Sequence, residues 1–250
     1  MGILRRLRRK KVLARETSPE WNLGMSAVWH LRDLDPERRD RVERDARLFA
    51  NEKHWEGCGG LKVSDGMKAV VSALACLLVV DNREGLFENT SSILLYPNGY
   101  TAPLAAGPMG IVSEGSARLG EAHFNGPVVL SWSDTLRQAT QHTGRNVVLH
   151  EFAHKLDMDD GLVHGTPLLP SSISHDRWVD TMTTEYDALR DGLAIGGPIA
   201  LPPYAATNPG EFFAVATERY FESPYALRSD RPELYALLKD YYGGTTPPVV

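Results

Sequence analysis

The sequence predicts an α+β protein in which a small mixed β-sheet packs on a central helix and further helices follow towards the C-terminus. Short β-like runs bounded by Gly, Pro and Asn occupy residues 92–132, and segments with helical periodicity lie on both sides of them. The segment over residues 146–157 is apolar apart from a few polar residues at helical spacing, which is typical of a buried helix. The 250 residues, 42% of them hydrophobic, are sufficient for one domain with a substantial core.

Composition and charge restrict the class of protein. A net charge of −5 argues against a general nucleic-acid-binding protein, because such proteins usually present a basic face. The two cysteines, Cys58 and Cys76, do not form a C-x-x-C pair, so we expect no disulfide framework and a reducing, cytoplasmic location. The longest apolar run, residues 69–80, is too short for a membrane span, which needs about 20 residues.

The N-terminus is strongly basic. Residues 1–15 (MGILRRLRRKKVLAR) lack the apolar stretch of a signal peptide. We expect a flexible, solubilising segment over residues 1–20, and the alternative is a weak contact of residues 1–15 with an anionic membrane surface. Residues 21–250 are then expected to form a single domain, with an N-terminal lobe over residues 21–144 and a C-terminal lobe over residues 145–250.

Helices are predicted on both sides of the sheet. Residues 35–51 carry alternating charges at helical spacing, which indicates a helix with a solvated outer face. Residues 69–80 (AVVSALACLLVV) follow Ser64, a typical N-cap, and predict a buried core helix. Beyond the central helix, residues 158–172 predict a loop and residues 175–192 a helix with an aromatic stripe.

The strands are short. Residues 92–97 (SILLYP), 110–114 (GIVSE) and 128–132 (VVLSW) are β-like runs between turn residues. Residues 117–124 alternate in part and can pair with residues 128–132 across an Asn-Gly turn. A sheet of this kind, next to the central helix, can hold an extended peptide by strand addition.

The central segment, NVVLHEFAHKLD, contains an H-E-x-x-H motif formed by His150, Glu151 and His154. In a helix the two histidines lie one turn apart with Cβ atoms about 5–6 Å apart, so both rings can reach one zinc ion. Glu151 lies about 100° further round the helix, where it can accept a proton from a zinc-activated water as a general base. The alternative, a surface helix with two chance histidines, is disfavoured because the remaining faces are apolar and buried polar groups need partners.

A catalytic zinc needs a third protein ligand, and Glu211 is the best candidate. Residues 208–222 (NPGEFFAVATERYFE) predict a mainly apolar helix with Asn208 as N-cap. A carboxylate buried in such a helix needs a charged or metal partner. The alternative is a first-turn glutamate stabilised by the helix dipole, and the residues alone leave both open. Glu218 lies seven residues on, where it either supports a ligand or faces solvent.

Two further residues are candidates for the same site. Tyr204 precedes Glu211 by seven residues, and its phenol can donate a hydrogen bond to an oxyanion, although the residues alone favour a loop tyrosine without a role. Asp157 follows His154 by three residues, so it can accept a ring N–H from a ligand histidine. Its alternative is a polar residue that only ends the helix.

Three segments resemble the Mlc titration factor A family of bacterial zinc peptidases, namely residues 126–132 (GPVVLSW), 146–157 and 208–222. Residues 60–80 also resemble the N-terminal half of that family, and the resemblance covers most of residues 30–242. It implies a zincin-like metallopeptidase fold related to the catalytic domain of anthrax lethal factor. It further implies one Zn²⁺ ion per chain, with the ligands His150, His154 and Glu211, and a catalytic-site tyrosine, Tyr204.

The resemblance also implies an activity. We expect a zinc-dependent metallopeptidase, specifically an aminopeptidase, with peptide or protein substrates, Glu151 as general base and Tyr204 at the oxyanion. A regulatory link to a transcriptional repressor of the Mlc type is implied as well. An aminopeptidase needs an acidic group for the substrate's amine, and the open candidates are Asp159, Asp160, Glu114 and Glu121.

Two other classes of protein stay open. A regulatory binding protein would sequester a transcriptional repressor and have weak or absent catalysis. A structural zinc protein would close the site with a fourth ligand, for which His123 and His164 are the candidates.

Overall fold

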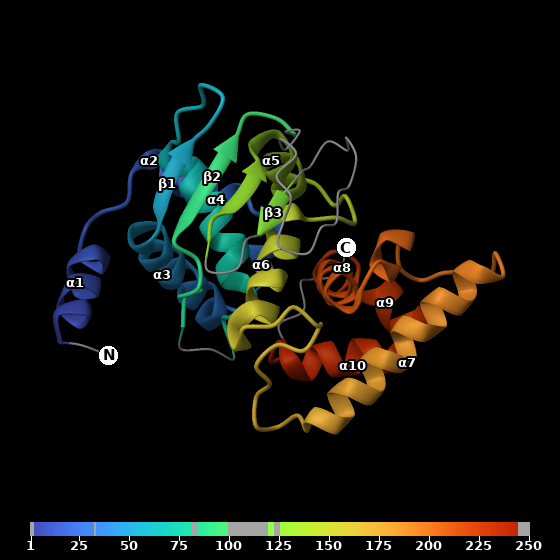
Figure 1. Ribbon diagram of the computed structural model, residues 1–250. Coiled ribbons are helices and arrows are strands. Elements are labelled where there is room, and N and C mark those ends of the chain that lie inside the picture. The colour runs from blue at the N-terminus through green and yellow to red at the C-terminus, as the bar shows by residue number, and fades with distance from the viewer. Residues whose placement is uncertain (1–2, 33, 82–84, 100–119, 123–125, 245–250) are drawn as a thin grey trace.

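The computed structural model describes residues 3–32, 34–81, 85–99, 120–122 and 126–244. A four-stranded sheet with helices packed against it forms one side of the molecule, and the helices of the C-terminal third lie beside it (Figure 1). The α+β class, with a small mixed sheet, a helix packed against it and further C-terminal helices, is therefore confirmed.

The sheet is mixed. Its strands occur in the spatial order β1-β2-β4-β3, where β1–β2 and β2–β4 are parallel pairs and β3–β4 is antiparallel. The bounds are β1 His54–Gly57, β2 Ser92–Tyr96, β3 Gly120–Ala122 and β4 Val128–Ser131. Because β1, β2 and β4 run parallel, the chain must cross over between them, and helix α4 makes the first crossing.

The predicted strands over residues 92–97 and 128–132 are confirmed as β2 and β4. The expected pairing of residues 117–124 with β4 is confirmed for residues 120–122, and the predicted strand over residues 110–114 lies outside the described residues. Strand β1 was not predicted, since its four residues (HWEG) are mostly polar and pair with a segment 38 positions further along the chain.

Ten α-helices occur in the described part of the chain. Their bounds are α1 Ile3–Leu13, α2 Pro19–Ala27, α3 Pro36–Glu52, α4 Asp65–Leu77, α5 Trp132–Thr140, α6 Val147–Asp157, α7 His175–Ala194, α8 Pro209–Glu222, α9 Pro224–Asp230 and α10 Pro232–Tyr241. Three single-turn 3-10 helices accompany them, η1 Trp29–Leu31, η2 Met158–Asp160 and η3 Pro203–Ala206. The helices predicted over residues 35–51, 69–80, 175–192 and 208–222 are confirmed as α3, α4, α7 and α8.

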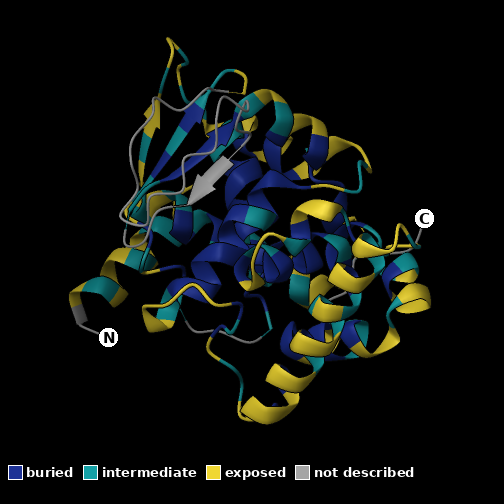
Figure 2. Ribbon diagram, turned by 45° about the vertical axis from the view of Figure 1, so that its right-hand side comes forward, coloured by how far each residue is buried: buried dark blue, intermediate teal, exposed yellow. Residues whose placement is uncertain are grey.

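Helix α4 forms the middle of the core. Ser64 caps its first turn by accepting a hydrogen bond from Met67 N at 3.3 Å, as predicted. Every residue from 69 to 80 is buried, and the helix packs against α2, α3, α5 and α6. Buried residues gather in the helices at the centre of the molecule, whereas exposed residues lie on the peripheral helices (Figure 2).

The N-terminal segment is helical where it is described, rather than frayed. In α1, Arg9 Nε donates to Glu52 of α3 at 2.6 Å, and Arg5 pairs with Glu52 and Glu88. These ion pairs give the basic segment partners that its composition alone does not reveal. Leu4 and Leu7 remain 83% and 52% exposed on the outer face, so the alternative of a membrane-surface contact stays a prediction.

Within the described residues, every helix is too short or too polar to cross a bilayer. The division into two lobes at residues 144 and 145 stays a prediction. The position of the sheet matters for function because α6 packs against both β3 and β4, and α8 packs against α6 on its other side.

Candidate metal centre

Helix α6 carries the H-E-x-x-H motif, as predicted. It begins after Asn146, whose Oδ1 accepts a hydrogen bond from Leu149 N at 3.2 Å. The N–H of Val147 donates to Gln138 Oε1 at 2.7 Å, which satisfies a second group of the first turn. All residues of the helix except His150 are buried, and His150 is half-buried, so its motif faces a largely water-excluded interior.

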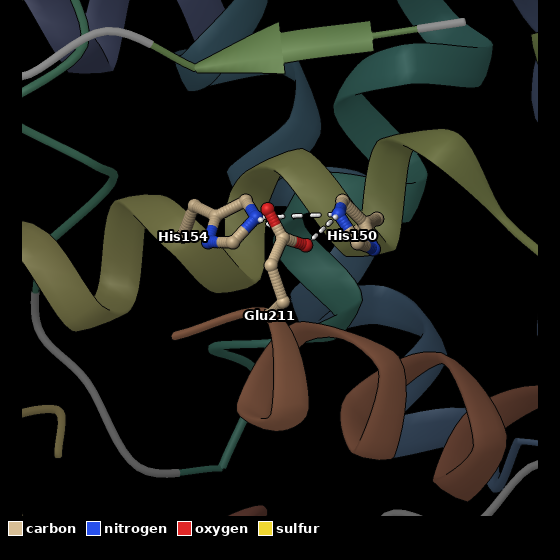
Figure 3. Close-up of side chains that lie close together, drawn as sticks. All are labelled: His150, His154 and Glu211. Carbon is tan, nitrogen blue, oxygen red and sulfur yellow. Dashed lines mark hydrogen bonds and ion pairs between the residues drawn. The ribbon is translucent and has the colours of Figure 1, made fainter. Parts of the chain in front are cut away.

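Helix α8 brings Glu211 to the same place. Asn208 accepts a hydrogen bond from Glu211 N at 2.9 Å, and Pro209 occupies the first helical position, as the sequence predicts. This start puts Glu211 in the first turn of α8, directly opposite the two histidines of α6 (Figure 3).

Three predicted side chains meet at one point. His150 Nε2 lies 3.2 Å from His154 Nε2, and Glu211 Oε2 lies 3.2 Å and 3.4 Å from these two nitrogens (Figure 3). Two ligands about 2.0–2.1 Å from a zinc ion at tetrahedral angles lie about 3.3 Å apart. The triangle therefore has the size of one face of a zinc tetrahedron.

The chemistry of the cluster also fits a metal ion. Glu211 Oε2 is buried and makes no hydrogen bond among the described residues, although it faces both histidines. Buried polar atoms without partners are costly, and a cation at the centre of the triangle would satisfy all three ligand atoms. Two imidazoles and one carboxylate are a donor set that suits zinc.

The electrostatics of the cluster point the same way. Burial alone lowers the pKa of His150, but its interactions with the Glu211 and Glu218 carboxylates outweigh burial and raise this pKa. Burial acts to raise the pKa of Glu211, but its interactions with His150 and His154 outweigh burial and lower this pKa. The carboxylates around the histidines thus favour positive charge at this position.

Glu218 supports His150 directly. Its Oε1 lies 2.7 Å from His150 Nδ1, and its Oε2 accepts a hydrogen bond from Asn146 N at 2.7 Å. A carboxylate on Nδ1 orients the ring and leaves Nε2 towards the triangle. Of the two alternatives for Glu218, the structure shows the contact with a histidine and not the solvent-exposed position.

Asp157 does not contact the ring of either motif histidine through a hydrogen bond. Its two carboxylate oxygens instead accept backbone hydrogen bonds from Gly165 and Thr166, both at 2.9 Å. The expected hydrogen bond to a ligand histidine is absent, because Asp157 points to the loop that follows α6. Burial raises the pKa of Asp157, while these bonds and the nearby His164 oppose that rise.

Glu151 is buried beside the triangle. Its side chain is 4% exposed, and burial raises its pKa, while the neighbouring charges of His150 and His154 oppose the rise. A raised pKa makes the carboxylate a stronger base, which favours uptake of a proton.

Tyr204 lies at the edge of the site, on η3. Its ring centroid is 6.2 Å from that of His150, and the residue is 56% exposed. The structure therefore brings the ring of Tyr204 beside His150, across 54 positions of sequence.

Of the remaining candidates, those that the structure describes are not part of the triangle. His164 Nδ1 is 3.5 Å from Asp157 and its Nε2 is 3.6 Å from Asp160, so it is not part of the triangle. Asp159 accepts a hydrogen bond from Asn89 at 2.8 Å. Glu114 and His123 lie outside the described residues, as does the side chain of Glu121.

Sequence reasoning missed several buried polar residues around α6. Lys155 is fully buried and donates to the carbonyls of Asn89 and Gly126, both at 3.1 Å. Asn146 and Glu222 join the N-terminus of α6 to α8 through a hydrogen bond of 3.1 Å. Asn146 stands in the N-cap position before an apolar run, which was a usable signal, whereas nothing local indicated the partners of Lys155 and Glu222.

The fold and the cluster define a metallopeptidase, and comparison with known proteins agrees. The family model of the glucose-regulated metallo-peptidase M90 matches residues 4–243, and the chain belongs to this family. The uncharacterized protein slr2042 of Synechocystis sp. is 33% identical over 241 residues, which are 94% of this chain and 87% of that protein.

Proteins named Mlc titration factor A are also similar. The one from Edwardsiella ictaluri is 31% identical over 86% of this chain and 84% of its own length. The one from Pectobacterium atrosepticum is 28% identical over 91% of this chain and 86% of its own length. The resemblance inferred from the three motif segments is thereby confirmed.

Proposed function

We propose that the protein is a zinc-dependent aminopeptidase, with His150, His154 and Glu211 as the ligands of one zinc ion. The observation that carries the proposal is the triangle of ligand atoms with edges of 3.2–3.4 Å. Among the described residues, no fourth His, Cys, Asp or Glu joins this cluster, which leaves one tetrahedral position for water or substrate. An open position is typical of a catalytic site and argues against a structural zinc protein.

A bound zinc ion would supply Lewis acidity towards a water molecule and a substrate carbonyl. Glu151 accepts the proton of the attacking water and delivers it to the amine that leaves. Its burial suits the first step, because a raised pKa makes the carboxylate a stronger base towards the proton of the water. Glu218 holds the ring of His150 through Nδ1 during the reaction.

Tyr204 acts on the substrate carbonyl, whereas Glu151 acts on the water. Its phenol donates a hydrogen bond to the oxyanion that develops on the substrate carbonyl, which stabilises charge where it appears. The position beside His150 and its partial exposure support this role, since the side chain can move towards a bound peptide.

The narrower activity is supported by the resemblance to the Mlc titration factor A family rather than by a recognised amine site. A decisive experiment compares aminoacyl chromogenic substrates with internally quenched, N-blocked peptides, using zinc-loaded protein. Cleavage of the free-amine substrates alone supports an aminopeptidase, and cleavage of the blocked peptides makes the protein an endopeptidase. Absence of turnover on both, with zinc bound, contradicts the proposal.

The matched variants are Glu151→Gln and Glu185→Gln. Glu151→Gln keeps the size of the side chain and removes its basicity, so we expect zinc content near one per chain and a turnover lower by about 10²–10⁴-fold. Glu185 is a partly buried glutamate on α7 that pairs with Arg231 at 3.5 Å, away from the cluster, and its variant is the control with unchanged turnover. Full activity of Glu151→Gln would exclude Glu151 as the base.

A second candidate function is a regulatory binding protein that sequesters a transcriptional repressor. The observation in its favour is the name of the relatives, which refers to titration of Mlc. Under this function, Glu151→Gln retains binding of a purified Mlc-type repressor in a sedimentation assay, and peptide turnover is negligible in both forms. A cytoplasmic location suits either function, and the unpaired state of Cys58 and Cys76 supports it.

A further inference from the structure

A buried chain of polar residues extends from His150 into the interior of the protein. It starts at Glu218, whose Oε1 lies 2.7 Å from His150 Nδ1 and whose Oε2 accepts a hydrogen bond from Asn146 N. Asn146 Nδ2 then donates to Glu222 Oε1 at 3.1 Å, and the same oxygen lies 2.7 Å from His30 Nε2. The chain thus connects four elements, α6, its N-cap, α8 and η1.

Its far end is completely enclosed. The side chains of His30 and Glu222 are both 0% exposed, and Asn146 is buried as well. The His30 ring stacks on Trp29 with centroids 3.7 Å apart, so its position is held on one face by an aromatic ring. Replacing a buried pair of this kind by apolar residues is often neutral or stabilising. The presence of His30 and Glu222 is therefore not explained by a gain in the stability of the fold.

Asn146 connects Glu218 at one end of the chain of polar residues to Glu222 at the other end. Its Oδ1 caps α6, its backbone N–H binds Glu218, and its Nδ2 binds Glu222, so each of its polar groups has a separate task. If Glu222 were removed, Nδ2 would be a buried donor without its partner, and the side chain would rotate to find another. Because Oδ1 and Nδ2 belong to one amide group, such a rotation would also withdraw Oδ1 from Leu149 N and remove the N-cap of α6. The backbone at residue 146, whose N–H holds the second oxygen of Glu218, would then lose the contact that fixes its position.

We propose that Glu222, held in place by His30, is a positioning residue for the metal centre. It fixes Asn146, Asn146 fixes Glu218, and Glu218 keeps the His150 ring oriented with Nε2 towards Glu211 and His154. This role rests on the proposed metal ligands, and it deepens that proposal by extending the support of His150 to a residue three contacts away from the ring.

A merely structural role makes a different prediction. If Glu222 only tied α8 to α6, its loss would lower the stability of the whole fold and leave the affinity for zinc in the folded protein unchanged. A positioning role changes zinc affinity and the environment of His150 even in molecules that remain folded. Two readouts separate the roles, the zinc dissociation constant from competition with a chromogenic chelator and the NMR signal of the His150 ring N–H.

The variants are Glu222→Leu and Glu222→Gln. Leucine fills the space without an acceptor, and we expect zinc affinity to fall by about 10-fold, at the lower end of the range for residues that support metal ligands. Glutamine still offers an oxygen to Asn146 Nδ2, and we expect it to restore affinity to within about threefold, because this acceptor is retained. The His150 N–H signal should shift in Glu222→Leu and return in Glu222→Gln.

Thr217→Val is the matched control. Thr217 lies on the same helix, and its buried hydroxyl bonds with Tyr242 at 2.8 Å on the side away from His150. It should lose stability and keep wild-type zinc affinity. Should Glu222→Leu not fold, Asn146→Ser replaces it, because serine retains an N-cap oxygen but has no Nδ2 donor, and it should weaken zinc binding in the same way.

The outcomes are distinguishable. Folded Glu222→Leu or Asn146→Ser with wild-type zinc affinity and an unshifted His150 signal would overturn the positioning role and leave the proposed activity untouched. Failure of the wild-type protein to bind zinc would overturn the metal centre itself. Equal losses of affinity in Glu222→Leu and Thr217→Val would assign both to general loosening of α8, which also overturns the proposal.

Discussion

Helices α4 and α6 are neighbours that are both buried nearly all round, yet they differ in what they bury. Each begins with a side-chain cap, Ser64 in α4 and Asn146 in α6. From residue 69 onwards α4 buries apolar side chains and one serine, Ser72. Helix α6 encloses, besides its apolar residues, the polar side chains of Glu151, His154, Lys155 and Asp157.

The difference between the two helices indicates that α4 serves mainly the stability of the fold and α6 mainly the candidate metal centre. Burial of apolar side chains stabilises the fold in proportion to the area removed from water, so α4 contributes stability without needing particular partners. Each polar residue of α6 requires a specific partner, and these partners lie outside the helix, at Glu218 for His150 and at the N–H of Gly165 for Asp157. Helix α6 thereby forms specific hydrogen bonds with α8 and with the loop that follows α6, while α4 contributes apolar packing.

The largest effect on stability should come from α4. Leu74 is fully buried, and Leu74→Ala should lower the free energy of unfolding by about 2–5 kcal/mol, because it removes apolar contacts and leaves a cavity. Zinc affinity of the folded fraction should stay at the wild-type value. Denaturant unfolding and chelator competition on the same sample measure both, and a parallel loss of zinc affinity would break the comparison.

A smaller effect should come from Asp157. Asp157→Ala leaves the N–H groups of Gly165 and Thr166 without their acceptor, at a cost of about 1–3 kcal/mol for the opening of this loop. Hydrogen exchange at these two amides should accelerate, while zinc affinity should change by less than about threefold, since Asp157 makes no bond to a ligand ring. A large loss of zinc affinity would restore the role that the sequence first suggested.

The effect of Glu218 should appear in metal binding. Glu218→Ala removes the acceptor on His150 Nδ1, and zinc affinity should fall by about 10–100-fold. Glu218→Gln retains an oxygen for that N–H and should lose less. Isothermal titration with zinc measures both, and equal affinities for all three proteins would show that the ring is held by packing alone.

A further effect concerns the dependence of stability on pH. Burial raises the pKa of Glu222 to about 8, the nearby Glu218 adds to the rise, and the Asn146 side chain and the charge of His142 oppose it. The neighbouring His30 is kept neutral, because burial lowers its pKa to about 3. The folded protein therefore holds a proton that the unfolded chain releases above about pH 4.5.

Stability should consequently decrease as pH rises from about 5 to about 8, by at most about 1.4 kcal/mol per pH unit for this one proton. Glu222→Gln removes the titration, so its unfolding free energy should change less over the same window. Urea unfolding of the metal-free proteins at several pH values gives the two slopes. Parallel slopes would mean that Glu222 is already ionised in the folded protein.

Local patterns sufficed for the elements that carry the site. The H-E-x-x-H spacing predicted α6, the Asn208-Pro209 start predicted α8, and the apolar run predicted α4. These features depend on neighbours within one or two turns, which a single sequence displays directly. The structure brings His150, His154 and Glu211 together as the motif and the resemblance indicated.

What sequence reasoning missed depends on distant pairing. Strand β1 is short and polar, and its identity comes from β2, its parallel neighbour. The partner of Glu222 is His30, 192 positions away, so no periodicity connects the two. Asp157 had the spacing to reach a histidine, but the hydrogen bonds offered by Gly165 and Thr166 decided its orientation.

Helix α8 determines the spacing of three carboxylates at and near the candidate metal centre. Glu211, Glu218 and Glu222 follow one another at intervals of seven and four residues, so they lie along one face of the helix, and each contacts α6 or its N-cap. A single extra residue between Glu211 and Glu218 would rotate the later two carboxylates by about 100° relative to the first. Within α8, point substitutions therefore change one contact at a time, whereas an insertion or deletion would dismantle the whole set in one genetic event.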